Sequence, residues 1–272
     1  MSSHLVIEAG RTESQYWRDL WRYRELFYFL AWRDFLIRYK QTAVGILWSL
    51  IRPVLAMLVL TVVGKIGGLS SGGAPYPIFC FCALLPWQFF STALSESGNS
   101  LVNNANLVSK IYFPRLVVPA SSVIVCFADF FISAVFLAAM MFYYQFLPPV
   151  QIFLLPLFVL MVLGVSLGSG LWVAALMVEY RDFRFIVPFA VQFGLYVSPV
   201  VWMTSKVPEQ WRFWYSLNPV VGIIDGFRWC ILGGGNVINF GEMAAAIGGI
   251  VFLLSTGLWY FRRMERTFAD TI

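Results

Sequence analysis

Six long apolar stretches separated by polar segments dominate the pattern of the chain. Each is long enough to cross a hydrocarbon core of about 30 Å as a helix, which takes about 20 residues. None shows the two-residue alternation of membrane-barrel strands, and a helix satisfies every backbone polar group within lipid. The pattern predicts an all-α membrane protein with six transmembrane helices, at residues 46–66, 76–95, 116–143, 152–177, 185–203 and 243–261.

Residues 16–40, before the first predicted span, follow a different pattern. Aromatic side chains recur on one side of a helix, and charged side chains cluster about a quarter turn away. This is typical of an amphipathic helix that lies along a membrane interface. Arg24 and Arg38 fall on its apolar side, where each must extend to water or pair with an acid. The helix is either a passive anchor or also a contact for a partner or an entering lipid headgroup.

The connection between the last two predicted spans, residues 204–242, is long and rich in aromatic residues. Asn218-Pro219 interrupts it, so we expect two short re-entrant helices that join there and bury the rings in the outer leaflet. The expected organisation is a cytoplasmic tail with the interface helix (1–45), a transmembrane domain (46–261) containing a coupling loop (96–115) and an outer gate segment (204–242), and a cytoplasmic tail (262–272).

Composition and charge agree with a membrane protein. The chain is 60% hydrophobic and 12% charged, with a mean hydropathy of +0.75, which excludes an ordinary soluble domain. Of the 19 Lys and Arg residues, 14 fall in segments on one side of the predicted spans. Because basic residues concentrate on the cytoplasmic side, both termini are predicted to face the cytoplasm, in the inner (plasma) membrane. The basic balance therefore reports orientation rather than nucleic-acid binding.

The residue types that most enzymes and pumps need are sparse. The chain has one histidine, His4, and no G-x-x-x-x-G-K-[ST] phosphate loop. No catalytic residue, metal site or chain-bound cofactor is therefore expected. The four cysteines, two of them the closely spaced Cys80 and Cys82, lie in apolar surroundings and are interpreted as small buried side chains.

Two ionisable residues within the predicted spans need an explanation. Asp129 lies deep in the third span and requires a partner or a proton, and structural pairing is favoured over a transport role. Arg52 lies one turn into the first span, where reaching the inner interface is favoured over gripping a headgroup phosphate.

Short stretches spread over the chain together resemble a known family. They are Arg33-Asp34, Arg38-Tyr39-Lys40, Leu47-Trp48 with Pro53, Lys110 with Phe113-Pro114-Arg115, Tyr180-Arg181-Asp182 with Ser198-Pro199, Asn218-Pro219 with Arg228, and Glu265 to Asp270. In this order they resemble the membrane subunits of type-two ATP-binding-cassette exporters of lipid-linked polysaccharides such as O-antigen, capsule and teichoic acid.

The resemblance implies a homodimer that encloses a channel, together with two ATPase subunits from another chain that use ATP and Mg²⁺. It also implies that the first cytoplasmic loop docks in the ATPase. The alternatives are positive-inside anchoring for the basic residues of this loop, and pairing with the amphipathic helix for the charges after the fourth span. The candidate coupling residues are Asn106, Lys110, Phe113, Pro114, Arg115, Glu179, Arg181 and Asp182.

Aromatic rings pack on the apolar faces of sugars, so rings in the outer segment are candidates for guiding a glycan, with a plain aromatic belt as the alternative. The candidate outer gate and glycan contacts are Trp202, Trp211, Trp214, Tyr215, Asn218, Pro219 and Arg228. The candidates for meeting an entering lipid headgroup are Arg33, Arg38, Lys40 and Arg52.

Two other functions compete with polysaccharide export. One is a type-two permease for drugs or small amphiphiles, which the aromatic density and the Phe-Pro-Arg and Arg-Asp stretches disfavour. The other is a membrane-embedded glycosyl- or acyltransferase, which would normally expose acidic or histidine residues at a membrane face. His4 and the scattered acids of residues 204–242 do not supply such a site.

Overall fold

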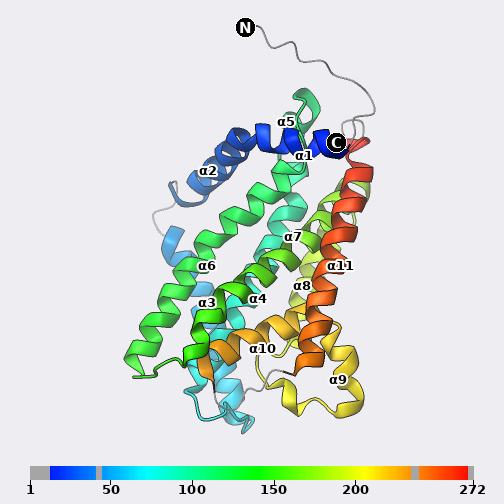
Figure 1. Cartoon of the computed structure of the whole chain (residues 1–272). Coiled ribbons are helices and arrows are strands. Elements are labelled where there is room, and N and C mark those ends of the chain that lie inside the picture. The colour runs from blue at the N-terminus through cyan, green and yellow to red at the C-terminus, as the bar shows by residue number, and fades with distance from the viewer. Residues whose placement is uncertain (1–12, 41–44, 234–238, 269–272) are drawn as a thin grey trace.

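The computed structural model describes residues 13–40, 45–233 and 239–268, and within these ranges all of its regular secondary structure is helical. Long helices form a bundle around α4, which contacts α3, α6, α7 and the short α10, while α11 packs against α7 (Figure 1). The long helices are α3 (Gly45–Ile66), α4 (Tyr76–Asn103), α6 (Val117–Tyr143), α7 (Leu155–Glu179) and α11 (Phe240–Met264).

These five helices are the ones in the described ranges that are long and apolar enough to cross a membrane. The predicted span at 185–203 is shorter than expected: α8 (Phe183–Val197) has 15 residues, about 22 Å of helix. It ends before Ser198-Pro199 because a proline disfavours helical conformation in the residue before it. The second span is longer than predicted, since α4 continues about two turns past residue 95, to Asn103.

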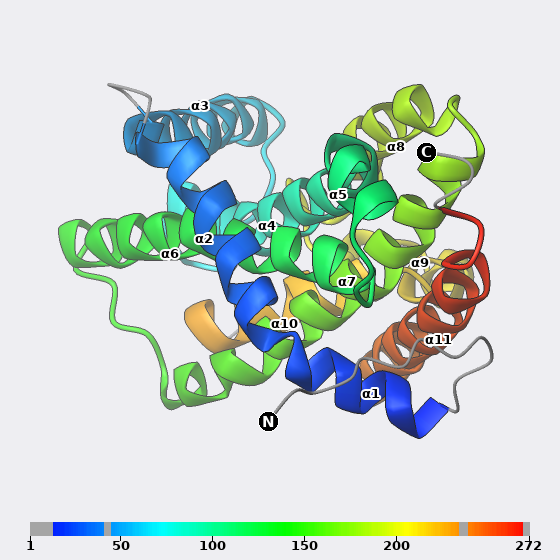
Figure 2. The ribbon, with the colours of Figure 1, turned by 90° about the horizontal axis from the view of Figure 1, so that it is seen from above.

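The segment predicted as one helix at 16–40 is two helices. α1 (Glu13–Arg22) and α2 (Arg24–Lys40) meet at Tyr23. They lie across one end of the bundle, with α2 passing over α6, and the C-terminal end of α11 reaches the same end (Figures 1 and 2). The position of α1 and α2 at a membrane interface stays a prediction.

The short helices occupy the two ends of the bundle. α5 (Ala105–Lys110) follows α4 at the end that carries α1 and α2, whereas α9 and α10 lie at the opposite end (Figure 1). The opposite end contains η1 (Val150–Leu154), η2 (Thr204–Lys206), α9 (Glu209–Ser216) and α10 (Pro219–Leu232).

The predicted pair of short helices joined at Asn218-Pro219 is present. The Asn218 side chain accepts a hydrogen bond from the Val220 N–H at 3.1 Å and so caps α10, while Pro219 occupies the first turn. The predicted burial of the rings in the outer leaflet stays a prediction; Trp211 and Trp214 of α9 are 59% and 65% exposed on the protein surface. On α10, which the bundle surrounds, Phe227 is fully buried within the protein.

Two apolar cores hold the helices together. The larger one fills the middle of the bundle, and a second lies at the end with α1 and α2, where Leu30 packs with Leu101, Phe113 and Phe261. The four cysteines are free and buried, as predicted. The Gly257 backbone lies so close to the Gly168 carbonyl that a Cβ there would collide with it, which brings α7 and α11 into close contact.

Candidate functional site

A cavity of about 410 Å³ lies between α2, α3, α4 and α6. Its volume is in the range of small-molecule binding sites. Residues from α3, α4 and α6 line it at helical spacing, so that one face of each helix is turned toward it. On α4 these residues are Leu85, Gln88, Phe89, Thr92 and Glu96.

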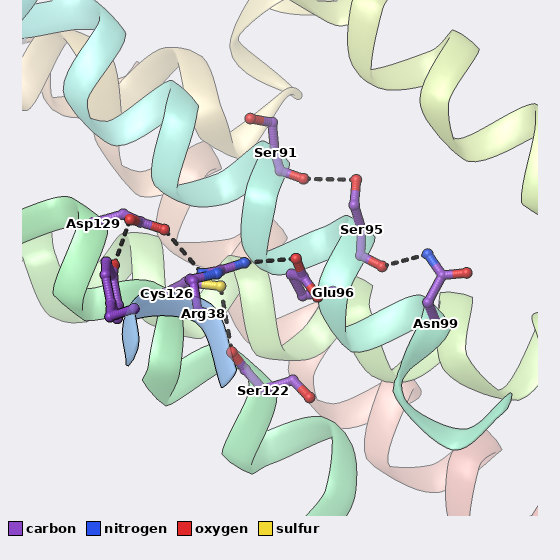
Figure 3. Close-up of polar contacts among 9 residues, drawn as sticks. Arg38, Ser91, Ser95, Glu96, Asn99, Ser122, Cys126 and Asp129 are labelled. Atoms are coloured by element: carbon purple, nitrogen blue, oxygen red, sulfur yellow. Dashed lines mark hydrogen bonds and ion pairs between the residues drawn. The ribbon is translucent and has the colours of Figure 1, made fainter. Parts of the chain in front are cut away.

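A charged network from three helices lines part of this cavity, and Figure 3 shows its contacts. The Arg38 guanidinium donates to Asp129 Oδ2 at 2.9 Å and to Glu96 Oε1 at 2.6 Å. The Tyr39 hydroxyl donates to the second oxygen, Oδ1, of Asp129 at 2.5 Å. Both carboxylates are therefore bound to one cation, which keeps their cost within the bundle low.

This network resolves two of the questions raised by the sequence. Asp129 was predicted to pair within the bundle, and Arg38 to extend or pair; the structure confirms both and pairs them with each other. The third member, Glu96, was not among the candidates. Nothing in the sequence links these residues, which lie 91 and 58 positions from Arg38.

The remaining lining combines uncharged polar groups, aromatic rings and a second cation. The half-buried side chains of Gln88 and Thr92 face the cavity, and among the described residues neither makes a hydrogen bond. Arg52 lies with its guanidinium carbon 5.9 Å from the Trp48 ring centroid. The thiol that lines the cavity, that of Cys126, is buried and donates to the Ser122 carbonyl at 3.3 Å. This lining suits binding of a polar molecule.

Two of the four candidates for meeting a lipid headgroup share this cavity, namely Arg38 and Arg52. Arg33 points elsewhere: it binds Asp34 and the Asn104 side chain, each at 2.7 Å, and so ties α2 to the end of α4. Lys40 is exposed and is not part of the cavity lining.

The first connecting loop contains exposed and buried candidates for ATPase coupling. Asn106 and Lys110 are exposed on α5, whereas Phe113 and Pro114 are buried beside the second core. The exposed pair is therefore accessible to a partner protein, while the buried pair fixes the path of the loop.

Arg115 is engaged within the chain. Its backbone N–H donates to Glu265 Oε1 at 2.7 Å, and its guanidinium donates to the Glu265 carbonyl. Burial raises the pKa of the Glu265 carboxyl above its usual range, and the hydrogen bond from the Arg115 N–H acts in the opposite direction. The contact fastens the loop to the end of α11.

The other coupling candidates lie at the end of α7. Glu179, Arg181 and Asp182 are exposed. Glu179 accepts a hydrogen bond from the Tyr260 hydroxyl of α11 at 3.1 Å, so the partner seen here is α11 rather than the amphipathic segment. Docking of these residues in an ATPase stays a prediction.

Arg228 is the most deeply buried of the outer-segment candidates. It has no exposed surface and lies 3.8 Å from the Phe79 ring centroid. Its guanidinium donates to the carbonyls of Val200 at 2.8 Å and Trp202 at 2.9 Å. The side chain is inaccessible to a glycan in this structure, and its predicted glycan contact stays a prediction.

Tyr76 completes the same arrangement, since its hydroxyl donates to the Val201 carbonyl at 2.9 Å. Three successive carbonyls just after α8 thus receive hydrogen bonds. Irregular backbone at membrane depth is tolerated where protein groups satisfy it in this way. The sequence offered no signal for Tyr76 as a partner of this segment.

The other outer candidates are spread over α9 and its surroundings. Trp211 and Trp214 are exposed on α9, Tyr215 and Trp202 are half-buried, and Asn218 and Pro219 form the start of α10. They share the end of the bundle opposite α1 and α2 (Figure 1).

Comparison with known proteins places this architecture in a family. The family model described as ABC-2 type transporter matches residues 25–232, which include α2, the cavity and α10. The chain belongs to the ABC-2 type transporter family. The family predicted from the sequence is thereby confirmed, and as an ABC-2 type transporter the chain is a multi-pass membrane protein and a transport subunit rather than an enzyme.

Curated relatives of this ABC-2 type transporter share most of its length. One is the O-antigen export system permease protein RfbA of Myxococcus xanthus, 28% identical over 213 residues, covering 78% of this chain and 82% of the relative. Another is the protein of the same name from Klebsiella pneumoniae, 24% identical over 242 residues, covering 88% and 92%.

Proposed function

We propose that this ABC-2 type transporter is the transmembrane subunit of an ATP-driven exporter that moves lipid-linked polysaccharide of the O-antigen type across the inner membrane. The observation that carries the proposal is the similarity to O-antigen export permeases along most of both chains. The polar cavity among the spans supports it, because a passage for small apolar drugs has no need of two arginines and two carboxylates.

The proposed assembly is a homodimer that encloses the channel, with two ATPase subunits from another chain. ATP and Mg²⁺ are used by those partners, since this chain has no phosphate-binding loop. Exposed Asn106 and Lys110 on α5 are the proposed docking surface, together with the charged end of α7. Both lie toward the end of the bundle that carries α1 and α2, as expected for one cytoplasmic face (Figure 1).

Both termini are proposed to face the cytoplasm, which requires an even number of crossings. The five long helices need a sixth crossing, and we assign it to α8 with the segment that follows. Arg228 and Tyr76 support this assignment, because they satisfy the carbonyls beyond the end of α8 that would otherwise face an apolar environment.

At the outer end, the exposed rings of α9 are proposed to border the exit of the channel. Trp211 and Trp214 present flat apolar faces on which sugar rings pack while their hydroxyls stay hydrated. The fully buried Arg228 holds the neighbouring backbone in place in this structure.

The proposal is tested in cells of the source organism that lack this gene. Loss of surface polysaccharide with accumulation of the lipid-linked polymer on the cytoplasmic side is the expected result, and restoration by the intact gene is the control. Normal surface polysaccharide together with increased sensitivity to small amphiphiles would instead support the drug-permease alternative.

A further inference from the structure

The cavity between α2, α3, α4 and α6 carries polar side chains that make no hydrogen bond among the described residues. Gln88 and Thr92 lie one turn apart on α4, half-buried, with an amide and a hydroxyl turned to the cavity and no hydrogen bond among the described residues. Such groups cost free energy among transmembrane helices unless water or a ligand supplies their partners. Their position indicates a ligand with several donors and acceptors.

The two arginines of the cavity, Arg38 and Arg52, differ in their ion pairs. Glu96 and Asp129 share one cation, Arg38, at 2.6 and 2.9 Å. Only Oε1 of Glu96 is bound in that network, and the side chain is 45% exposed, so its second oxygen remains an acceptor. Arg52 takes part in none of the ion pairs among the described residues, so its positive charge is available to an anion.

The third feature of the cavity is its aromatic lining. Trp48 belongs to the same wall as Arg52 and lies beneath its guanidinium. Rings beside amide, hydroxyl and carboxylate groups match the alternation of apolar C–H faces and hydroxyls on a sugar. Arg52 lies in the same space without an ion pair among the described residues, and its guanidinium matches a phosphate oxygen.

We infer that this cavity binds the sugar–phosphate junction of a glycolipid, with the phosphate at Arg52 and the first sugar against Gln88, Thr92 and Glu96. The inference rests on the proposed function and extends it, because it assigns recognition of the lipid-proximal sugar to this chain. Arg38 acts as a positioning residue that holds Glu96 in place. Inorganic phosphate is expected to be the weaker ligand, since it lacks the sugar that would meet Gln88, Thr92 and Glu96.

The test measures binding to the complex of this chain with its ATPase partner in lipid nanodiscs. The probes are a polyprenyl phosphate carrying one hexose, the same polyprenyl phosphate without sugar, and inorganic phosphate. Two variants perturb the cavity: the double variant Gln88→Leu/Thr92→Val and the single variant Arg52→Gln.

The matched control is Ser91→Ala/Ser95→Ala. It also removes two hydroxyl groups from α4, but these bond to the helix backbone, at 3.1 and 2.9 Å, and do not line the cavity (Figure 3).

The double variant is expected to bind the sugar-bearing lipid about tenfold more weakly than wild type, because two hydrogen bonds to the sugar are lost. Its affinity for the sugar-free lipid is expected to equal that of wild type. Arg52→Gln is expected to weaken both lipids about tenfold or more. Inorganic phosphate should bind more weakly than either lipid, and the serine control should match wild type.

Equal weakening of both lipids by the double variant, or no weakening of either, would overturn the sugar position. Tight binding of inorganic phosphate that Arg52→Gln abolishes would show an anion site without sugar recognition. Polysaccharide export by the wild-type complex in the same preparation distinguishes failure of the proposed site from failure of the proposed function. If export is intact and the double variant binds both lipids normally, only the site is refuted. If export is absent, the proposed function is refuted.

Discussion

The guanidinium of Arg38 lies 2.9 Å from the Asp129 carboxylate and joins α2, at one end of the bundle, to the middle of α6. Glu96 of α4 binds the second arm of the same guanidinium at 2.6 Å. A single residue of the amphipathic segment therefore connects two of the long helices. Arg38 therefore links the amphipathic segment to the cavity, together with Tyr39, which also binds Asp129.

A double-mutant cycle measures this link. Arg38→Met and Asp129→Asn should each lower the free energy of unfolding, while the double variant should lose less than the sum, with a coupling of about 1–2 kcal/mol. The measurement is denaturant titration of the purified protein in micelles. The control cycle, Arg33→Met with Asp34→Asn, removes an ion pair with side chains 35% and 28% exposed and should show a coupling below about 1 kcal/mol. Strictly additive effects at Arg38 and Asp129 would contradict the link.

Loss of Arg228, the buried arginine of α10, should destabilise the protein more than loss of Arg212 of α9. Arg228→Met leaves the carbonyls of Val200 and Trp202 without donors in the interior and should cost about 2–4 kcal/mol. Arg212→Met also removes bonds to two carbonyls, at 3.0 and 3.2 Å, but at a more exposed place, and should cost less than about 1 kcal/mol. Thermal unfolding of both variants decides the comparison; equal losses would show that Arg228 does not support the backbone after α8.

Periodicity and composition were sufficient to predict the helical membrane fold, because a run of apolar residues has few alternatives in lipid. Of the six spans that they predicted, five are long apolar helices in the structure, and the helix pair at Asn218-Pro219 is present. The end of α4 could not be predicted, since polar residues such as Ser97 and Asn99 continue the helix where the spacing suggested a loop. The break at Tyr23 also escaped prediction because no proline or glycine marks it.

The candidate site was predicted only in part, for a different reason. Arg38, Arg52 and Asp129 were recognisable because a charge in or beside a span is costly and needs an explanation. Gln88 and Thr92 are uncharged residues within α4 that nothing in the sequence singles out, and their significance follows from the cavity alone. The pairing of Arg38 with Asp129 depends on tertiary contact between α2 and α6.

The two basic residues of the first loop should respond differently to charge reversal. Lys110→Glu changes an exposed residue of α5 and should reduce co-purification of the ATPase by about tenfold while leaving the melting temperature unchanged. Arg115→Glu places a carboxylate beside Glu265 and should lower the melting temperature by several degrees. Loss of stability in Lys110→Glu, or unchanged co-purification, would leave plain positive-inside anchoring as its role.

The rings of α9 offer a test of the outer gate. Trp211→Ala with Trp214→Ala removes two exposed side chains, so the protein should fold and reach the membrane normally. Export of polysaccharide should fall at least severalfold and small ions should leak through the resting channel, because a seal and a stacking surface are both lost. The control is Phe240→Ala, which truncates an exposed ring at the start of α11. Normal export with a tight barrier would show that the α9 rings serve only as an aromatic belt.

The most direct test of the proposed function is reconstitution of this chain with its ATPase partner in sealed vesicles. Lipid-linked polysaccharide is placed in the leaflet that faces the ATPase, and its arrival in the other leaflet is measured by binding of a glycan-specific lectin from that side. Transport that requires hydrolysable ATP and both chains, with no ATP hydrolysis by this chain alone, is the predicted result. Absence of ATP-dependent arrival in vesicles with an active ATPase, or hydrolysis by the isolated chain, would contradict it.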